Sequence, residues 1–89
     1  MEYESGPSKA KANLRKHAVS FVDAAMALED PRALTMADPD ASGEQRFDSL
    51  GADPSGRVLV TVFTPRGRRT RLVSSRKAGR NERRACESQ

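Results

Sequence analysis

Apolar residues recur at helical spacing in the first segment of the chain, residues 5–18. Gly6 can serve as an N-cap, Pro7 suits the first helical position, and Ala10 and Leu14 fall on one face. The basic residues of this segment lie largely on the opposite face. The pattern predicts an amphipathic helix with a narrow apolar face, which anchors it only weakly.

A second helix is predicted directly afterwards, in the stretch VSFVDAAMALEDP. Ser20 is a favourable N-cap, and Phe21, Ala25 and Leu28 share one face at helical spacing. The helix should end before Pro31, because the residue that precedes a proline resists the helical region.

Strand-like alternation dominates the remaining two thirds of the chain. We predict strands within residues 32–36, 45–51, 57–64 and 69–76, with a loop at 38–44. The run RVLVTVFT carries apolar groups on both faces, which indicates a central strand. The order of the runs predicts an antiparallel meander.

Two turns and a closing helix complete the predicted elements. Residues 53–56 fit a type I turn, and Pro65 and Gly67 repeat the same arrangement at the second and fourth turn positions. Residues 79–87 read as a short helix, for which Gly79 is a tolerable N-cap.

These elements predict a single α+β domain over residues 1–89, with a frayed tail at residues 87–89. It should contain two N-terminal helices, an antiparallel sheet of three or four strands and a short C-terminal helix. Apolar residues make up 36% of the chain and aromatic residues 4%, with no tryptophan. The core should therefore be small, and a partner chain could contribute to order.

Charge is distributed unevenly along the chain. Residues 23–53 contain eight acidic and two basic residues, whereas residues 66–84 contain nine basic residues and one acidic residue. This asymmetry indicates one side that faces a polyanion. Cys86 is the only cysteine, so no intrachain disulfide is expected. No signal peptide or membrane span is apparent, and we expect a cytoplasmic protein.

The arginines after the central strand have two interpretations. Alternation places Arg69 and Arg71 on one face of the returning strand and Arg76 on the other, and the closing helix adds Arg80, Arg83 and Arg84. Guanidinium groups bind phosphate bidentately, so the set can form a phosphate-tracking surface. A solvated charged face explains the composition equally well.

Two further charged groups are candidates for chemistry. Lys16 and His17 end the first helix, where a cation suits the helix dipole, and His17 can be a cap, a packing group, a phosphate ligand or a general base. Glu44 and Arg46 begin a strand after a glycine and read either as an exposed pair or as catalytic groups. No motif of a metal site, a phosphate-binding loop or a nucleophile elbow is present.

Four segments occur together in the order and spacing typical of one family: KANLRKHAVSFVDA, EDPRALTMADPD, GEQRFDSLG and RLVSSRKAGRNERR. On these segments the chain resembles the BrnT toxins of type II toxin–antitoxin systems, from Tyr3 to Glu87. The resemblance implies a RelE-like fold and an RNA-cleaving activity that blocks translation without a metal or other cofactor. It also implies a BrnA-like antitoxin partner, with operator DNA contacted only through that antitoxin.

The resemblance also assigns site residues. The expected catalytic residues are Lys16, His17, Arg71, Arg76 and Glu82. The expected RNA-binding residues are Arg46 and Arg83 at motif positions, together with Arg69 and Arg80 from the basic surface described above, and Glu44 holds a further motif position. Arg71 and Arg76 are expected to stabilise the phosphate and the transition state. Glu82 is expected either to orient Arg76 or to transfer a proton, and Lys16 or His17 to act as base or electrostatic stabiliser.

Three departures from the family pattern bear on activity. Ser5 and Gly6 replace the usual tryptophan and aspartate, Ala18 replaces a glycine expected in the left-handed conformation, and Cys86 replaces a tyrosine on the last helix. A thiol cannot stack on a base as a ring does. Two alternatives therefore stand beside the toxin hypothesis: a catalytically weak subunit that binds antitoxin and co-represses its operon, and a small basic RNA-binding protein with no toxin role.

Overall fold

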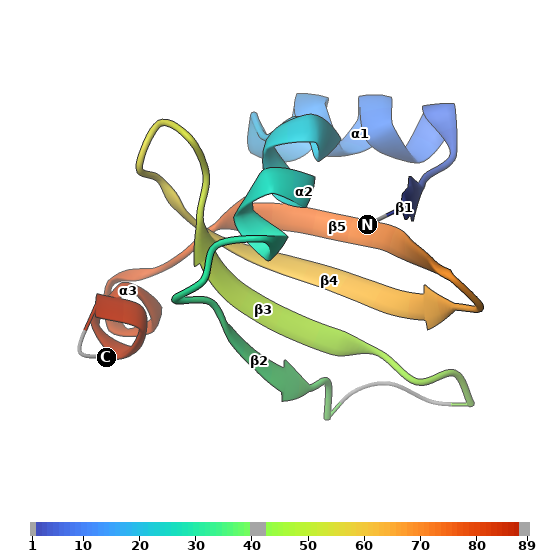
Figure 1. Ribbon diagram of the computed structural model, residues 1–89. Coiled ribbons are helices and arrows are strands. Elements are labelled where there is room, and N and C mark those ends of the chain that lie inside the picture. Colours follow the sequence, from blue (N-terminus) through green and yellow to red (C-terminus); the bar gives the residue numbers. More distant parts are fainter. Residues whose placement is uncertain (1, 40–42, 88–89) are drawn as a thin grey trace.

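The computed structural model describes residues 2–39 and 43–87 (Figure 1). Parts of the predicted loop at 38–44 and of the predicted tail at 87–89 lie outside these ranges. In chain order the elements are β1 (Glu2–Glu4), α1 (Pro7–His17), α2 (Phe21–Leu28), β2 (Leu34–Ala37), β3 (Phe47–Ala52), β4 (Val58–Arg66), β5 (Arg69–Lys77) and α3 (Arg80–Glu87). Within these ranges, no helix has the length and apolar character needed to cross a membrane.

The described residues form a single five-stranded sheet in the order β1-β5-β4-β3-β2. The α+β class is confirmed, but the predicted antiparallel sheet of three or four strands is wrong in detail. Strands β2 to β5 form the antiparallel meander, and β1 pairs parallel to β5, with Tyr3 opposite Thr70. The three residues of β1 include two glutamates and carry no strand signal in the sequence. They form a strand because the edge of β5 offers them backbone hydrogen-bond partners.

The helices cover both faces of the sheet. Helices α1 and α2 lie over one face, and α3 lies at the far end of the sheet (Figure 1). Phe21 of α2 packs with Leu72 of β5, whereas Cys86 of α3 packs with Leu50 and Val60. Leu72 pairs with Phe63, three residues from Val60 on β4, so the two clusters occupy opposite faces. The core is therefore divided into small clusters by the sheet.

Helix α1 is anchored by a polar residue rather than by its apolar stripe. Leu14 is 53% exposed, whereas Asn13 is only 6% exposed. The Asn13 amide donates to the carbonyl oxygens of Val19 and Ser75, both at 2.9 Å, and its oxygen accepts from the Ser75 N–H at 3.0 Å. Ala10 of the predicted face does pack against the Phe21 cluster, but the prediction for Leu14 is wrong, because a count of apolar positions cannot register an asparagine whose buried groups are all satisfied.

Helix α2 is confirmed as predicted from its caps. The Ser20 hydroxyl accepts a hydrogen bond from the Asp23 N–H at 3.1 Å, and the helix ends at Leu28. It packs closely on β3 because Gly51 carries no side chain. A Cβ added there would overlap the carbonyl oxygen of Ala27.

One predicted turn is confirmed and the other is wrong. The Gly56 N–H donates to the Asp53 carbonyl at 2.9 Å, as the type I turn requires. At the β4–β5 hairpin, however, Pro65 lies within β4, and Gly67 with φ +62° opens a two-residue turn. A mirror-image turn with glycine at its first central position matches the twist of the two strands, so the turn lies two residues later than predicted.

Candidate nucleic-acid interface

A bulge in β5 brings the key arginines to one face of the sheet. Val62 pairs with Ser74 and Phe63 with Leu72, so Val73 is an extra residue that shifts the alternation by one. Arg71 and Arg76 were predicted on opposite faces, and this is wrong. Arg71 lies opposite Thr64 and Arg76 opposite Val60, positions of β4 that share a face because they are four residues apart.

We call this side of the sheet the arginine face; it is opposite to α1 and α2 and carries Arg66, Arg69, Arg71 and Arg76. The positions of Arg71 and Arg76 are about 13 Å apart, at about 3.3 Å per residue over four residues of β4. The face presents two groups of cations along β5 and the adjoining end of β4.

Arg76 forms the first group together with Glu82 of α3. The two guanidinium nitrogens Nη1 and Nη2 donate to Oε1 and Oε2 of Glu82, both at 2.9 Å. The Gly79 N–H also donates to Glu82 Oε1 at 2.8 Å, which fixes the carboxylate at the start of α3. The hydrogen bond from Arg76 is the main reason that the pKa of Glu82 falls to about 2, and the same bond raises the pKa of Arg76. Both side chains are charged at neutral pH.

The second group surrounds Glu4 of β1. Its carboxylate oxygens lie 3.7 Å from Arg66 Nε, 3.7 Å from Arg69 Nη1 and 4.0 Å from Arg71 Nε. Three cations therefore face one anion. None of these distances is as short as the 2.7–2.9 Å typical of charge-assisted hydrogen bonds.

The end of α1 lies beside the same strand, on its helix side. Lys16 and His17 line an open pocket together with Val73 and Ser74 of β5. The next residue, Ala18, has φ 57° and ψ 32°, the left-handed conformation expected from the family glycine at this position. The structure thus places Lys16 and His17 near the bulge but on the side of the sheet opposite to the arginine face.

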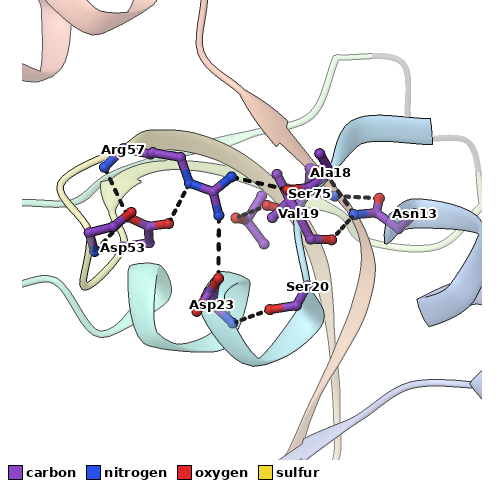
Figure 2. Close-up of polar contacts among 10 residues, drawn as sticks. Asn13, Ala18, Val19, Ser20, Asp23, Asp53, Arg57 and Ser75 are labelled. Atoms are coloured by element: carbon purple, nitrogen blue, oxygen red, sulfur yellow. Dashed lines mark hydrogen bonds and ion pairs between the residues drawn. The ribbon is translucent and has the colours of Figure 1, made fainter. Parts of the chain in front are cut away.

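A network that sequence reasoning missed fixes this helix end (Figure 2). Arg57 donates from Nη1 to the Ala18 carbonyl at 3.0 Å, from Nε to Asp53 at 2.8 Å and from Nη2 to Asp23 at 3.3 Å. Burial of Asp53 favours its neutral form, but hydrogen bonds from Arg57 and Ser55 outweigh burial and lower the pKa of Asp53. The only sequence signal was an acidic turn residue four positions before an arginine.

Other predicted site residues lie apart from this cluster. Glu44 and Arg46 were predicted to begin a strand, and this is wrong: β3 begins at Phe47, and both charged residues are exposed before it. The chain there continues the β2–β3 connection, where the Arg46 carbonyl accepts from the Asp38 N–H at 2.9 Å.

Helix α3 carries the remaining candidates. Arg80 is exposed near its start, and Arg83 lines a pocket with Arg57 and Lys77. Cys86 is 7% exposed, and its thiol faces the Leu50 carbonyl oxygen at 3.8 Å. The side chain of Cys86 is therefore directed into the protein. Within residues 2–39 and 43–87, no three His, Cys, Asp or Glu side chains are grouped so that they could hold a metal ion.

The fold and the site define a small basic α+β protein whose arginines gather on one face of a sheet. A family model described as "Ribonuclease toxin, BrnT, of type II toxin-antitoxin system" matches residues 6–82. The chain therefore belongs to the BrnT family of ribonuclease toxins, as its resemblance implied.

A comparison with solved structures supports the same fold. The chain is similar to the ribonuclease toxin BrnT of Brucella abortus, a crystal structure at 1.1 Å resolution, with a TM-score of 0.67 and 20% sequence identity. The match covers 90% of this chain and 99% of that chain. A search of curated protein sequences finds no significant match.

Proposed function

We propose that this chain is an endoribonuclease that cuts RNA and thereby inhibits translation. The arginine face is the observation that carries this proposal, because the bulge at Val73 brings Arg71 and Arg76 to one side of a rigid sheet. Guanidinium groups bind phosphate bidentately and stay charged at any physiological pH. Membership of the BrnT family supports the same activity.

Cleavage by such a site would be an internal phosphoryl transfer. A ribose 2′-oxygen attacks the adjacent phosphorus, and the bond to the 5′-oxygen of the next nucleotide breaks. A base takes the 2′-hydroxyl proton and an acid protonates the leaving oxygen, which gives a 2′,3′-cyclic phosphate and a 5′-hydroxyl. Negative charge accumulates on the phosphoryl oxygens, so fixed cations lower the barrier without a metal ion.

Arg71 and Arg76 are assigned to the phosphate and its transition state. The two-point hydrogen bond from Arg76 supports a positioning role for Glu82, because it fixes the plane of the guanidinium. With a pKa of about 2, Glu82 holds no proton near neutral pH, which disfavours it as general acid.

Lys16 and His17 are assigned to the base or to electrostatic stabilisation. The pocket that they line is on the α1 side of β5, across the sheet from the arginine face, so this assignment rests on their motif positions in the family. Further RNA contacts are assigned to Arg46, Arg69, Arg80 and Arg83. All four are exposed, and salt-sensitive phosphate contacts suit such side chains.

The proposed partner is a BrnA-like antitoxin that silences the enzyme, as a type II system requires. Operator DNA is then contacted only through the antitoxin, and the complex acts in the cytoplasm, where RNA is available. The small core clusters fit this assignment, because a partner that binds only the folded chain raises its apparent stability by mass action.

The burial of Cys86 supports an alternative function. At this position the resemblance implies a tyrosine, and a buried thiol cannot take over its contact with substrate. A catalytically weak subunit that binds antitoxin and represses transcription would show little cleavage. A single assay of RNA cleavage distinguishes the two functions.

The assay uses full-length chain made by cell-free synthesis, since a toxin arrests its host. We expect wild-type protein to yield position-specific cuts with cyclic-phosphate ends, and Arg76→Ala to lose about 10²–10³-fold in rate, as for removal of one transition-state donor. Lys11→Ala, at an exposed cation of α1 that has no assigned role, is the control and should cleave normally. Absence of cleavage by folded wild type would favour the alternative, and full activity of Arg76→Ala would remove its assigned role.

A further inference from the structure

The cations around Glu4 outnumber the anion that they surround. Arg66, Arg69 and Arg71 approach one carboxylate at 3.7–4.0 Å, so three positive charges share one anion in these ion pairs. Between 45% and 60% of each arginine side chain is exposed, and 29% of the Glu4 side chain. The three guanidinium groups lie close together around Glu4, are accessible to solvent, and are farther from its oxygens than a normal charge-assisted hydrogen bond requires.

Strand β1 fixes the position of Glu4, and the strand itself is anchored on the opposite face of the sheet. Glu4 lies opposite Arg71 in the parallel ladder, and alternation directs the neighbouring Tyr3 towards the helices. The Tyr3 hydroxyl donates to Glu29 at 2.9 Å and to the Ala25 carbonyl at 3.2 Å. The carboxylate of Glu4 is thus positioned by an anchored segment rather than by a free terminus.

We propose that Glu4 occupies a phosphate subsite formed by Arg66, Arg69 and Arg71, so that an RNA phosphate must displace it. Exposed ion pairs at such distances contribute little, so displacement is easy. A phosphodiester has two non-bridging oxygens, and each can accept guanidinium hydrogen bonds of the usual donor–acceptor length. Glu4 therefore acts as a built-in competitor that weakens RNA binding.

This subsite rests on the proposed function and adds to it. It lies about 13 Å along the sheet from Arg76, so it binds a different phosphate of the same strand from the one that is cleaved. Arg66, which no sequence motif singled out, becomes a substrate-binding residue. The subsite also refines the assignment of Arg71, which then holds the neighbouring phosphate while Arg76 stays at the reacting group.

The test measures binding of a short single-stranded RNA that is 2′-O-methylated throughout, so that it cannot be cleaved. Full-length wild type, Glu4→Gln and Glu2→Gln are titrated by fluorescence anisotropy over a range of salt concentrations. Glu2 is the matched control, since it lies two residues earlier on the same strand with the same charge. We expect Glu4→Gln to bind roughly three- to tenfold more tightly at low salt, with a much smaller gain for Glu2→Gln.

Arg66→Ala gives a second arm that leaves β1 intact. It should weaken binding and reduce the magnitude of the slope of log affinity against log salt by about 0.7, the value for one phosphate contact of a single strand. If wild type binds RNA while folded Glu4→Gln gains no more than Glu2→Gln, or if Arg66→Ala keeps the full slope, the subsite is wrong and the proposed function stands. If folded wild type binds no RNA, the proposed function fails as well.

Discussion

Replacement of Asn13 by alanine should remove the main anchor of α1. The side chain is 6% exposed and satisfies three backbone groups: the carbonyl oxygens of Val19 and Ser75 and the N–H of Ser75. In Asn13→Ala each of these groups loses its partner. An unsatisfied buried backbone group costs about 1–3 kcal/mol. Some of that loss is recovered here, because Asn13 borders the open pocket at the end of α1 and water can enter.

The expected destabilisation is about 3 kcal/mol. That is a large share of the roughly 5–13 kcal/mol available to a domain of this size. It corresponds to a fall in Tm of about 12–24 °C at 4–8 °C per kcal/mol. Urea unfolding followed by circular dichroism measures the free energy, and thermal unfolding checks it. Asn81→Ala, at an exposed asparagine in the first turn of α3, is the matched control and should stay within about 0.5 kcal/mol of wild type.

A charge variant separates lost hydrogen bonds from lost packing. Asn13→Asp keeps the acceptor for the Ser75 N–H but turns the donor into an oxygen that faces two carbonyls. Only a protonated carboxyl can donate there, so we expect its pKa to rise and the stability gap to wild type to narrow as pH falls below about 5. An Asn13→Ala protein within 1 kcal/mol of wild type, or an Asn13→Asp gap that does not change with pH, would refute the anchoring role.

Three further predictions concern backbone fit and charge. Ala18→Gly should stabilise the fold by about 1 kcal/mol in urea unfolding, because residue 18 has φ 57°. Gly51→Ala should destabilise it by more than about 2 kcal/mol, because the added methyl overlaps the backbone of α2. Glu82→Gln should lower the free energy of unfolding by under about 1 kcal/mol at pH 7, since Arg76 and Glu82 are both exposed. This difference from wild type should disappear as pH falls from 4.5 through about 2, because the wild-type carboxylate gains its proton in that range.

Each of these three predictions has a control variant or an outcome that would contradict it. Ala12→Gly, in the exposed interior of α1, should destabilise by about 1 kcal/mol, so equal effects at residues 12 and 18 would contradict the left-handed argument. Gly6→Ala has open space around the new Cβ and should change stability far less than Gly51→Ala. If the effect of Glu82→Gln did not change with pH, the hydrogen bond from Arg76 would not be what stabilises the ionised Glu82 carboxylate.

Much of the fold was predictable because local signals and tertiary structure agree. The Ser20 cap, the proline after α2, and the alternation of β3 to β5 each specify an element without reference to distant residues. Strand β1 was not predictable in this way. Its three residues become a strand only through the free edge of β5, which is a property of the folded sheet.

The candidate site depended on a feature that alternation alone cannot show. The residue types and positions of Arg71, Arg76 and Glu82 came from family resemblance, but their common face depends on the bulge at Val73. The Arg57 network and the Glu4 cluster were missed for a related reason. Each joins residues far apart in the chain, and none of those residues carries an unusual local signal.

The extra residue in β5 decides on which side of the sheet the end of the chain emerges. If Val73 were instead paired regularly with Val62, Arg76 would lie opposite Leu59 and turn to the side of α1 and α2. Helix α3 would then begin from the wrong side of the sheet. Deletion of Val73 alone, by contrast, leaves Arg76 opposite Val60, so this strand should tolerate loss of the bulge but not a bulge moved past Arg76.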